Sequence, residues 1–357
     1  MLNFTVGPVM MSDEVRKIGG QEIPYFRTTE FSQIMFENEC NLKTLFGAKE
    51  EDKAIFLTSS GTGAMEASVI NCFTKDDKVL IINGGGFGQR FVDICTIHSI
   101  PHSEVKLAPG KALHKEDLKP FVGKGYTGFL IQACETSSGV AFDLKLVSDF
   151  CKENNLFLVV DAISGFLADE INMSELGIDV MFTGSQKALS TAPGIALIVL
   201  NQRAINKVKQ VHVQSLYFGF ESYLKNMERG QTPFTPAVGT LLELNYQLKF
   251  FAEKGIAKLN SEIKNRAQYF RTLITDLPLQ LFAETPSNCC TALQVSGNNS
   301  AHEIFNIIKN EYHMFVCPNG GELKDKVFRV GHIGNLMLDD FKQLSDVLHD
   351  MNSRNLL

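Results

Sequence analysis

One lysine stands among small residues in the segment 184–189, which reads Gly-Ser-Gln-Lys-Ala-Leu and follows an apolar run at 180–183. An ammonium group is strongly hydrated, so Lys187 either stays at the surface or has a chemical task. One such task is a Schiff base with a carbonyl, formed by an amine in a mostly dry pocket. Upstream, Asp161 ends another apolar run, 156–160. Together the two side chains would suit pyridoxal phosphate, which needs a lysine for its aldehyde and an acid for its ring nitrogen.

A turn of small residues follows the apolar run 54–57 and opens a predicted helix. It contains Ser60, Gly61 and Thr62 within the sequence Ser-Ser-Gly-Thr-Gly-Ala-Met-Glu. Exposed N–H groups at the start of a helix bind phosphate, and glycine lets the backbone approach the anion. Many turns of this kind bind nothing. The lysine of a nucleotide-binding P-loop is missing, which disfavours a nucleoside triphosphate.

Two more turns follow apolar runs. Residues 84–89 read Gly-Gly-Gly-Phe-Gly-Gln, where Phe87 either stacks on a flat ring or caps the core. Because the pattern is not Gly-x-Gly-x-x-Gly, a dehydrogenase is disfavoured. In the segment 135–140, Thr136 can hydrogen-bond a ring hydroxyl or cap the next helix, and the motif alone favours the cap.

The runs that position these residues are apolar throughout instead of alternating, which is typical of strands covered on both faces. We therefore predict an α/β fold with a parallel or mostly parallel sheet between helices, which binds its ligand at the carboxyl ends of the strands. Helices are expected at 63–73, 89–98 and 144–154. The predicted strands are residues 54–57, 78–82, 128–132, 156–160, 180–182 and 195–199.

The pattern changes after residue 240. Residues 241–276 predict a long helical stretch with an interruption at Gly255, followed by the strands 291–295 and 327–331 and by the helices 300–311 and 339–352. This arrangement predicts a large α/β domain at 16–240. A smaller α+β domain combines 1–15 with 241–357. No linker rich in proline or serine separates the two, so we expect them to pack closely.

The composition narrows the class of protein. The chain has 357 residues, 44% of them hydrophobic, a net charge of −6 and no basic run, which disfavours nucleic acid and anionic membranes as partners. No apolar run is long enough to span a bilayer. The eight cysteines show no paired Cys-x-x-Cys spacing, and no His-Glu-x-x-His occurs, so we expect a reduced, cytoplasmic protein without a metal site.

The order of these groups along the chain resembles that of the class V aminotransferases, which are fold-type-I enzymes dependent on pyridoxal 5'-phosphate. The order is the phosphate turn, the aromatic ring, the hydroxyl, the carboxylate and the lysine. The resemblance runs from the sequence Thr-Val-Gly-Pro-Val at 5–9 to Phe-Arg-Val-Gly-His-Ile-Gly at 328–334. It is closest to the branch of alanine–glyoxylate, serine–pyruvate and 2-aminoethylphosphonate–pyruvate transaminases. The motif at 184–189 is its most specific part.

The resemblance implies a role for each matching residue. Lys187 would carry the cofactor and move the proton, while Asp161 would pair with the ring nitrogen. Arg329 would clamp the substrate carboxylate, which the backbone near Gly7 would line from the other side. The remaining cofactor contacts would be Ser60, Gly61, Thr62 and Gln186 at the phosphate, Phe87 on the ring face and Thr136 near the ring hydroxyl.

The resemblance also implies a homodimer with shared active sites, because Thr235 matches a threonine that reaches the phosphate of a neighbouring subunit. Two departures stand out. Thr232 replaces a common aromatic residue, and Phe26 replaces a histidine before Arg27. Arg27 either binds an anionic substrate group or forms a structural ion pair.

The implied reaction moves an amino group from a small amino acid, such as alanine, serine or 2-aminoethylphosphonate, to a 2-oxo acid such as pyruvate or glyoxylate by a ping-pong mechanism. A lyase or a cysteine desulfurase on the same fold is the alternative, with Cys317 as the candidate thiol. A non-catalytic regulatory protein on this fold is disfavoured because Lys187, Asp161 and Arg329 are all present.

Overall fold

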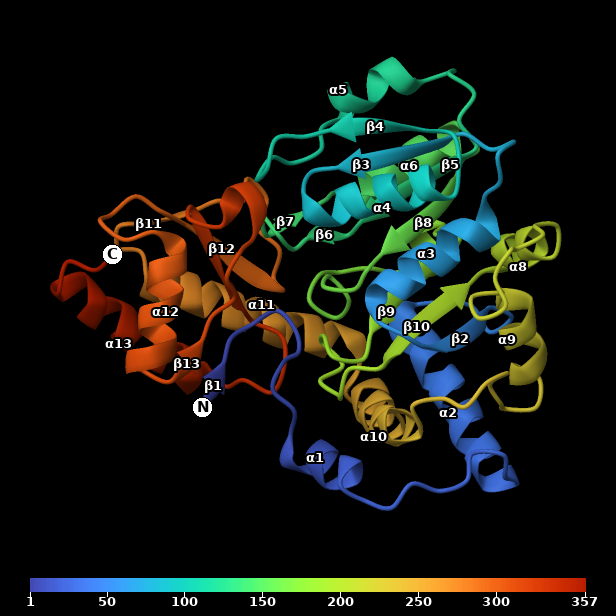
Figure 1. Cartoon of the computed structure of the whole chain (residues 1–357), viewed down its shortest axis with the longest axis horizontal. Coiled ribbons are helices and arrows are strands. Elements are labelled where there is room, and N and C mark those ends of the chain that lie inside the picture. Colours follow the sequence, from blue (N-terminus) through green and yellow to red (C-terminus); the bar gives the residue numbers. More distant parts are fainter.

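A seven-stranded sheet forms the centre of the computed structural model, which describes all 357 residues (Figure 1). All strands run parallel except β10, which is antiparallel to both of its neighbours. The predicted α/β class with a mostly parallel sheet is therefore confirmed. In spatial order the strands are β2 (Lys53–Thr58), β10 (Ile195–Leu200), β9 (Val180–Gly184), β8 (Phe157–Asp161), β5 (Gly128–Gln132), β3 (Val79–Asn83) and β4 (His102–Lys106).

Six of these strands were predicted from their apolar runs, and β4 was not. Only Val105 of β4 is buried, because β4 is the edge strand and its other side chains are exposed in part. An edge strand needs little apolar sequence, so the apolar-run criterion does not detect it.

Helices cover both faces of the sheet, and each strand sends alternate side chains to two separate cores. Ala54 and Phe56 of β2 belong to one core, and Ile55 and Leu57 belong to the other. The first core is closed by α2 (Thr29–Phe46), α6 (Leu144–Glu153) and α10 (Val238–Lys254). The second is closed by α3 (Gly61–Cys72), α4 (Gly86–Ile97), α8 (Gln202–Val208) and α9 (Phe220–Met227).

The predicted start of the helix at 89–98 is wrong, because this helix, α4, already begins at Gly86. Phe87 therefore lies in the first turn of a helix and not on a loop before it. The cause is a carboxylate from another segment, Glu135, which accepts hydrogen bonds from the Phe87 and Gly88 N–H groups. These amides would otherwise lack partners at the helix start.

The C-terminal part follows the sequence pattern closely. The long helical stretch is divided at Gly255, whose φ of +84° ends α10 before α11 (Ile256–Leu273) begins. A three-stranded antiparallel sheet of β11 (Leu279–Leu281), β12 (Cys290–Val295) and β14 (Val327–Gly331) then packs with α12 (Ala301–Glu311) and α13 (Leu338–Ser353) around a third core.

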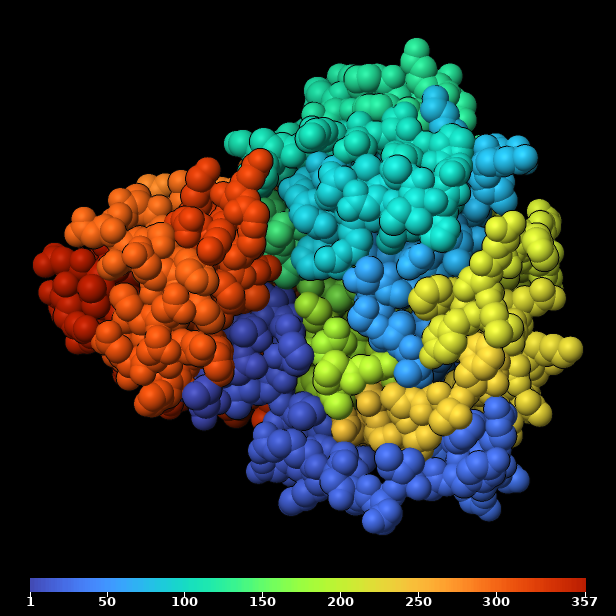
Figure 2. All heavy atoms as spheres, viewed as in Figure 1, coloured from blue at the N-terminus to red at the C-terminus, as the bar shows by residue number.

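The N-terminus joins this C-terminal part. Strand β1 (Leu2–Asn3) pairs in parallel with β13 (Met314–Phe315), and α1 (Asp13–Gly19) packs against α10. Figure 2 shows the N-terminal segment, in blue, lying between the orange C-terminal part and the yellow-green segment that follows β9. A division of the chain at residue 240 stays a prediction, because α10 spans that residue and packs against α2.

The remaining elements are short. None of the helices has both the length and the apolar character that crossing a membrane requires. The short elements are α5 (Lys115–Leu118), α7 (Met173–Leu176), the 3-10 helices at Lys119–Phe121 and Gly321–Leu323, and the hairpin of β6 (Cys134–Glu135) and β7 (Val140–Ala141).

Candidate active site

The predicted lysine and carboxylate meet at one edge of the sheet. Asp161 is the last residue of β8, and Lys187 lies three residues beyond the end of the neighbouring parallel strand β9. Asp161 is 4% exposed, and its Oδ1 accepts a hydrogen bond from the Ile163 N–H at 2.8 Å. The Lys187 Nζ donates to the Val6 carbonyl at 2.9 Å. Both groups thus lie at the carboxyl ends of parallel strands, where this class of sheet binds ligands.

Burial shifts the pKa of both Asp161 and Lys187. It raises the pKa of Asp161 to about 7, and the nearby charge of Glu135 acts in the same direction while Lys187 acts against it. Burial also lowers the pKa of Lys187, an effect that the Cys289 and Cys317 thiols and Asp161 oppose. The uncharged amine is the nucleophilic form, so this environment makes Lys187 more reactive than a surface lysine.

The N-terminal segment closes over the lysine. Gly7 has a φ of +137°, and a Cβ at this position would lie 2.6 Å from the Lys187 Cδ. Farther along, the Val9 N–H donates to the carbonyl of Gln186 at 3.2 Å. Only glycine leaves room for the lysine side chain here, so the Gly7 backbone lies directly against Lys187, and its contact with a substrate carboxylate stays a prediction.

The turn at Ser60, Gly61 and Thr62 forms the N-terminus of α3. Ser60 is the N-cap residue, but its side chain makes no capping hydrogen bond, and the Gly61 and Thr62 amides have no acceptor in the protein. A Cβ on Gly61 would lie 2.2 Å from the Ile163 Cδ1, so a larger residue here would require the Ile163 side chain to move. An uncapped first turn in a helix of 12 residues is a suitable anion site.

The second glycine turn is closed by the protein itself. Glu135 is fully buried, and its carboxylate accepts hydrogen bonds from the Phe87 N–H at 3.1 Å, the Gly88 N–H at 3.0 Å and the Gln132 Nε2 at 2.8 Å. The positive end of α4 is therefore occupied by a carboxylate and does not offer a second phosphate site. The sequence contained no signal that pairs Glu135 with this turn.

Arg90 is a site residue that the sequence analysis missed. Its Nη1 donates to the Thr62 Oγ1 at 2.9 Å, and its guanidinium carbon lies 4.9 Å from the centre of the Phe87 ring. Phe87 and Arg90 are three residues apart, so they share a face of α4 once the helix starts at Gly86. The guanidinium thus connects the anion turn to the aromatic ring.

Thr136 does not cap a helix. Its Oγ1 donates to the Ser164 Oγ at 2.7 Å, and both side chains are buried. Helix α6 is capped instead by Asp143, which accepts from the Lys145 and Leu146 amides. The cap interpretation of Thr136 is therefore wrong, and its hydroxyl stays close to the segment that follows Asp161.

Arg329 is brought to the same place from the C-terminal part. It lies in β14, and its Nη1 donates to the Thr136 carbonyl at 3.0 Å. Its Nη2 donates to the Pro318 carbonyl, while its buried Nε has no acceptor in the protein. A half-buried guanidinium with a free N–H is suited to bind a carboxylate.

Arg27, Thr232 and Thr235 form a separate group. The Arg27 guanidinium donates to the Gln231 Oε1 at 3.0 Å and to the Pro233 carbonyl at 3.3 Å, and it forms no ion pair. Thr232 is buried and donates to the Phe234 carbonyl, whereas Thr235 is exposed. No hydrogen bond or ion pair joins this group to Lys187 or Asp161 within one chain.

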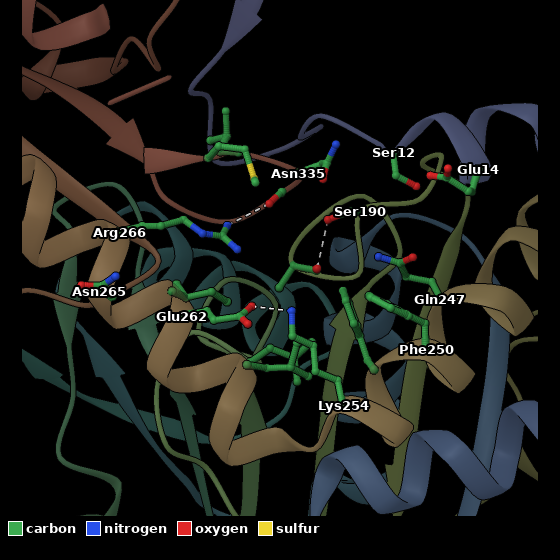
Figure 3. A pocket seen from close by; sticks show the side chains of 18 of the residues that line it. Ser12, Glu14, Ser190, Gln247, Phe250, Lys254, Glu262, Asn265, Arg266 and Asn335 are labelled. Atoms are coloured by element: carbon green, nitrogen blue, oxygen red, sulfur yellow. Dashed lines mark hydrogen bonds and ion pairs between the residues drawn. The ribbon is translucent and has the colours of Figure 1, made fainter. Parts of the chain in front are cut away.

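A cavity lies beside this constellation and not within it. It has a volume of about 490 Å³ and is lined by α10, α11 and the segment 334–338, together with Ser190 from the segment that follows β9 (Figure 3). Three of its charged side chains already have partners: Lys254 pairs with Glu262 at 2.5 Å, and Arg266 donates to the Gly334 carbonyl. None of the predicted site residues lines this cavity.

The donor set fits pyridoxal phosphate. An open helix N-terminus suits the phosphate, a buried carboxylate suits the ring nitrogen and a lysine with a lowered pKa suits the aldehyde. Phe87 lies in the first turn of α4, which follows β3, and Thr136 directly follows β6.

Comparisons with known proteins agree with this fit. The sequence profile described as aminotransferase class-V matches residues 24–311. An uncharacterized aminotransferase of Helicobacter pylori is 32% identical over 339 residues, covering 94% of this chain and 89% of that protein. The L-aspartate–glyoxylate aminotransferase of Paracoccus denitrificans is 26% identical over 343 residues, covering 93% and 86%. The crystal structure of an alanine–glyoxylate aminotransferase from Nostoc sp. shares the fold with a TM-score of 0.92 at 24% identity, covering 98% of this chain and 94% of that chain.

The lowered pKa of Lys187 predicts a reactivity that can be measured without any substrate. Amine-directed labelling of the cofactor-free protein, followed residue by residue by mass spectrometry, should reach half its maximal rate at a lower pH for Lys187 than for the exposed Lys342. The order follows from the pKa shifts, since burial lowers the first pKa and the Asp346 carboxylate raises the second. Equal midpoints would show that Lys187 is not in a dry environment.

Proposed function

The chain belongs to the class-V aminotransferase family, and from this premise we propose that it transfers the amino group of a small amino acid to a 2-oxo acid such as glyoxylate or pyruvate. The enzyme is an aminotransferase that uses pyridoxal phosphate. One observation carries the proposal: Lys187 and Asp161 lie at the ends of adjacent strands, next to the uncapped N-terminus of α3. When bound, pyridoxal phosphate acts as an electron sink and carries the amino group between two half-reactions, so we expect ping-pong kinetics.

The residues of the chain then have defined tasks. Asp161 would hold a proton at the ring nitrogen, and the Lys187 amine would take the α-proton of the donor and deliver it to the cofactor carbon. Ser60, Gly61, Thr62 and Gln186 hold the phosphate. Phe87, kept in place by Arg90, covers one face of the ring. Thr136 lies close to the ring hydroxyl.

The substrate is held from two directions. Arg329 offers its free Nε and the outer face of its guanidinium to a carboxylate, while its other N–H groups are fixed by the Thr136 and Pro318 carbonyls. The backbone at Gly7 closes the opposite side above the lysine. This arrangement favours a donor with a short side chain and a free carboxylate, such as alanine or serine.

The position of Cys317 disfavours the desulfurase alternative. Its N–H donates to the Arg329 carbonyl at 2.7 Å, and the Arg329 N–H donates to the Cys317 carbonyl at 2.8 Å. A desulfurase requires a cysteine on a mobile loop that carries sulfur away from the site. Cys317 is instead fixed opposite the arginine by two backbone hydrogen bonds.

We propose that two copies of the chain share their active sites. Thr235 is exposed, so its hydroxyl is free to reach the phosphate held by α3 of a partner subunit. Arg27 donates hydrogen bonds to Gln231 and Pro233 of the same segment. This structural role is an alternative to the binding of an anionic substrate group by Arg27. All eight cysteines are free, in keeping with a role in the reducing cytoplasm.

The visible spectrum tests the central assignment. The protein reconstituted with pyridoxal phosphate should absorb in the visible range while the cofactor is attached to Lys187, and a competent donor should bleach this band. Alanine, serine, aspartate, 2-aminoethylphosphonate and cysteine would be added one at a time, and Lys187→Ala should show neither the band nor turnover. A band that no donor bleaches would contradict transamination, and release of sulfide from cysteine would restore the desulfurase.

Substitution of Arg329 tests the carboxylate site. We expect Arg329→Gln to lower kcat/KM for alanine by about 30-fold or more, mainly through KM, because a buried charged partner of the carboxylate is lost. The exposed Lys326 in the same region offers a control, and Lys326→Gln should leave both constants unchanged. An unaltered KM in Arg329→Gln with an intact cofactor band would exclude this role.

Mixed dimers test the shared site. Inactive Lys187→Ala subunits and weakened Thr235→Glu subunits would be mixed and allowed to exchange. If each site takes Lys187 from one chain and Thr235 from the other, random mixing restores about a quarter of the native activity, because every mixed dimer contains one intact site. Activity no higher than the average of the two separate variants would mean that the residues act within one chain.

A further inference from the structure

Three cysteines distant in the sequence bring their sulfur atoms together behind the active site. The Cys134 Sγ lies 3.4 Å from the Cys289 Sγ, which in turn lies 3.6 Å from the Cys290 Sγ, and the three sulfurs all lie within 4.8 Å of one another. All three side chains are buried. No other group of three or more His, Cys, Asp or Glu residues in the chain has this spacing.

The cluster connects the two parts of the fold. Cys134 begins β6 of the hairpin that precedes α6, whereas Cys289 and Cys290 stand at the start of β12 in the C-terminal sheet. The hairpin is fixed against β12: the Ser287 N–H donates to the Gly139 carbonyl at 2.9 Å, and a Cβ on Gly139 would lie 3.0 Å from the Ala292 Cβ. The sulfur atoms are therefore held in place by backbone on both sides.

We propose that Cys134, Cys289 and Cys290 form a three-thiolate binding site for one soft monovalent metal ion, of which Cu(I) is the biological example. Thiolates select soft ions such as Cu(I) and zinc. With metal–sulfur distances of about 2.3 Å, three sulfurs around one ion would stand about 4.0 Å apart, so the observed sulfurs need to separate only slightly. This site does not depend on the proposed transamination.

The cluster offers three ligands and not four, which favours a monovalent ion over zinc. Structural zinc almost always has four protein ligands in a tetrahedron. Asp169, an acid whose charge acts on Cys289, is already engaged, since its two oxygens accept from the Ser287 Oγ at 2.5 Å and from the Asn288 N–H at 2.9 Å. A three-coordinate site of sulfur alone is what this geometry offers.

The surrounding charges also match. Three thiolates around a monovalent ion leave two negative charges, and two guanidiniums lie beside the cluster. Arg271 donates to the Cys290 carbonyl at 3.3 Å, and Arg329 lies opposite Ala292 on β14, close enough for its charge to act on Cys290. The two guanidiniums therefore lower the net negative charge of the complex, to which the Asp169 carboxylate near Cys289 adds one negative charge.

The test uses the full-length, cofactor-loaded protein, reduced and kept free of oxygen. Cu(I) would be titrated in the presence of a coloured Cu(I) chelator, with long incubation because the sulfurs are buried. We expect one Cu(I) per chain withheld from the chelator and an X-ray absorption spectrum of three sulfur ligands. Failure of the native protein to compete with the chelator would overturn the proposal, as would zinc binding with four ligands in preference to Cu(I).

Variants locate the site. Cys134→Ser and Cys289→Ala should each lose the tightly held ion, while Cys40→Ser, an exposed position, and Cys72→Ser, a buried but remote one, should retain it. Circular dichroism would establish that each variant is folded. Unchanged uptake in a folded Cys134→Ser/Cys289→Ala double variant would overturn the assignment, and the absorption spectrum of the native protein decides the matter if the variants fail to fold.

Discussion

The site depends on keeping the Lys187 amine and the Asp161 carboxylate buried at the carboxyl ends of the neighbouring strands β9 and β8. Burial is the main cause that lowers the pKa of Lys187 and raises that of Asp161 to about 7, and each group moderates the shift of the other. The protein tolerates this desolvation because the Lys187 Nζ donates to the Val6 carbonyl and the Asp161 carboxylate accepts the Ile163 N–H. The same hydrogen bonds that make burial tolerable also fix the two groups in position for chemistry.

Two similar turns in the sequence acquire opposite functions. Both are rich in glycine, follow a buried strand and open a helix of 12 residues. The N-terminus of α4 is filled by the carboxylate of Glu135, whereas that of α3 has no internal partner. The fold thus satisfies one helix from within and leaves the other for an external anion. This contrast favours the N-terminus of α3 as the proposed phosphate site, a choice that the glycine patterns alone could not make.

Features of the fold and site that depend on residues near one another in the sequence could be predicted, and features that depend on distant residues could not. Apolar runs report burial on both faces, so they revealed six strands of the sheet, and the small edge strand β4 escaped because it is half exposed. The motif around Lys187 and the position of Asp161 are local, and both were found. Arg90 was missed because its role depends on the helix starting at Gly86, and that start is set by Glu135, 49 residues beyond it. The cysteine cluster joins residues 155 positions apart, a separation that no local pattern reports.

The segments that complete the site come from both ends of the chain, and this has a mechanical consequence. Gly7 belongs to an N-terminal segment that is attached to the C-terminal part through β1 and β13, yet its backbone lies against Lys187 at the edge of the large sheet. Arg329, from the C-terminal part, donates to the Thr136 carbonyl in the segment after β6. Any displacement of the C-terminal part would therefore move the segment over the lysine and the Arg329 guanidinium together. Under the role proposed for Arg329, substrate binding and access to Lys187 are coupled through the C-terminal part, and the thiol cluster lies at its contact with the large sheet, between β6 and β12.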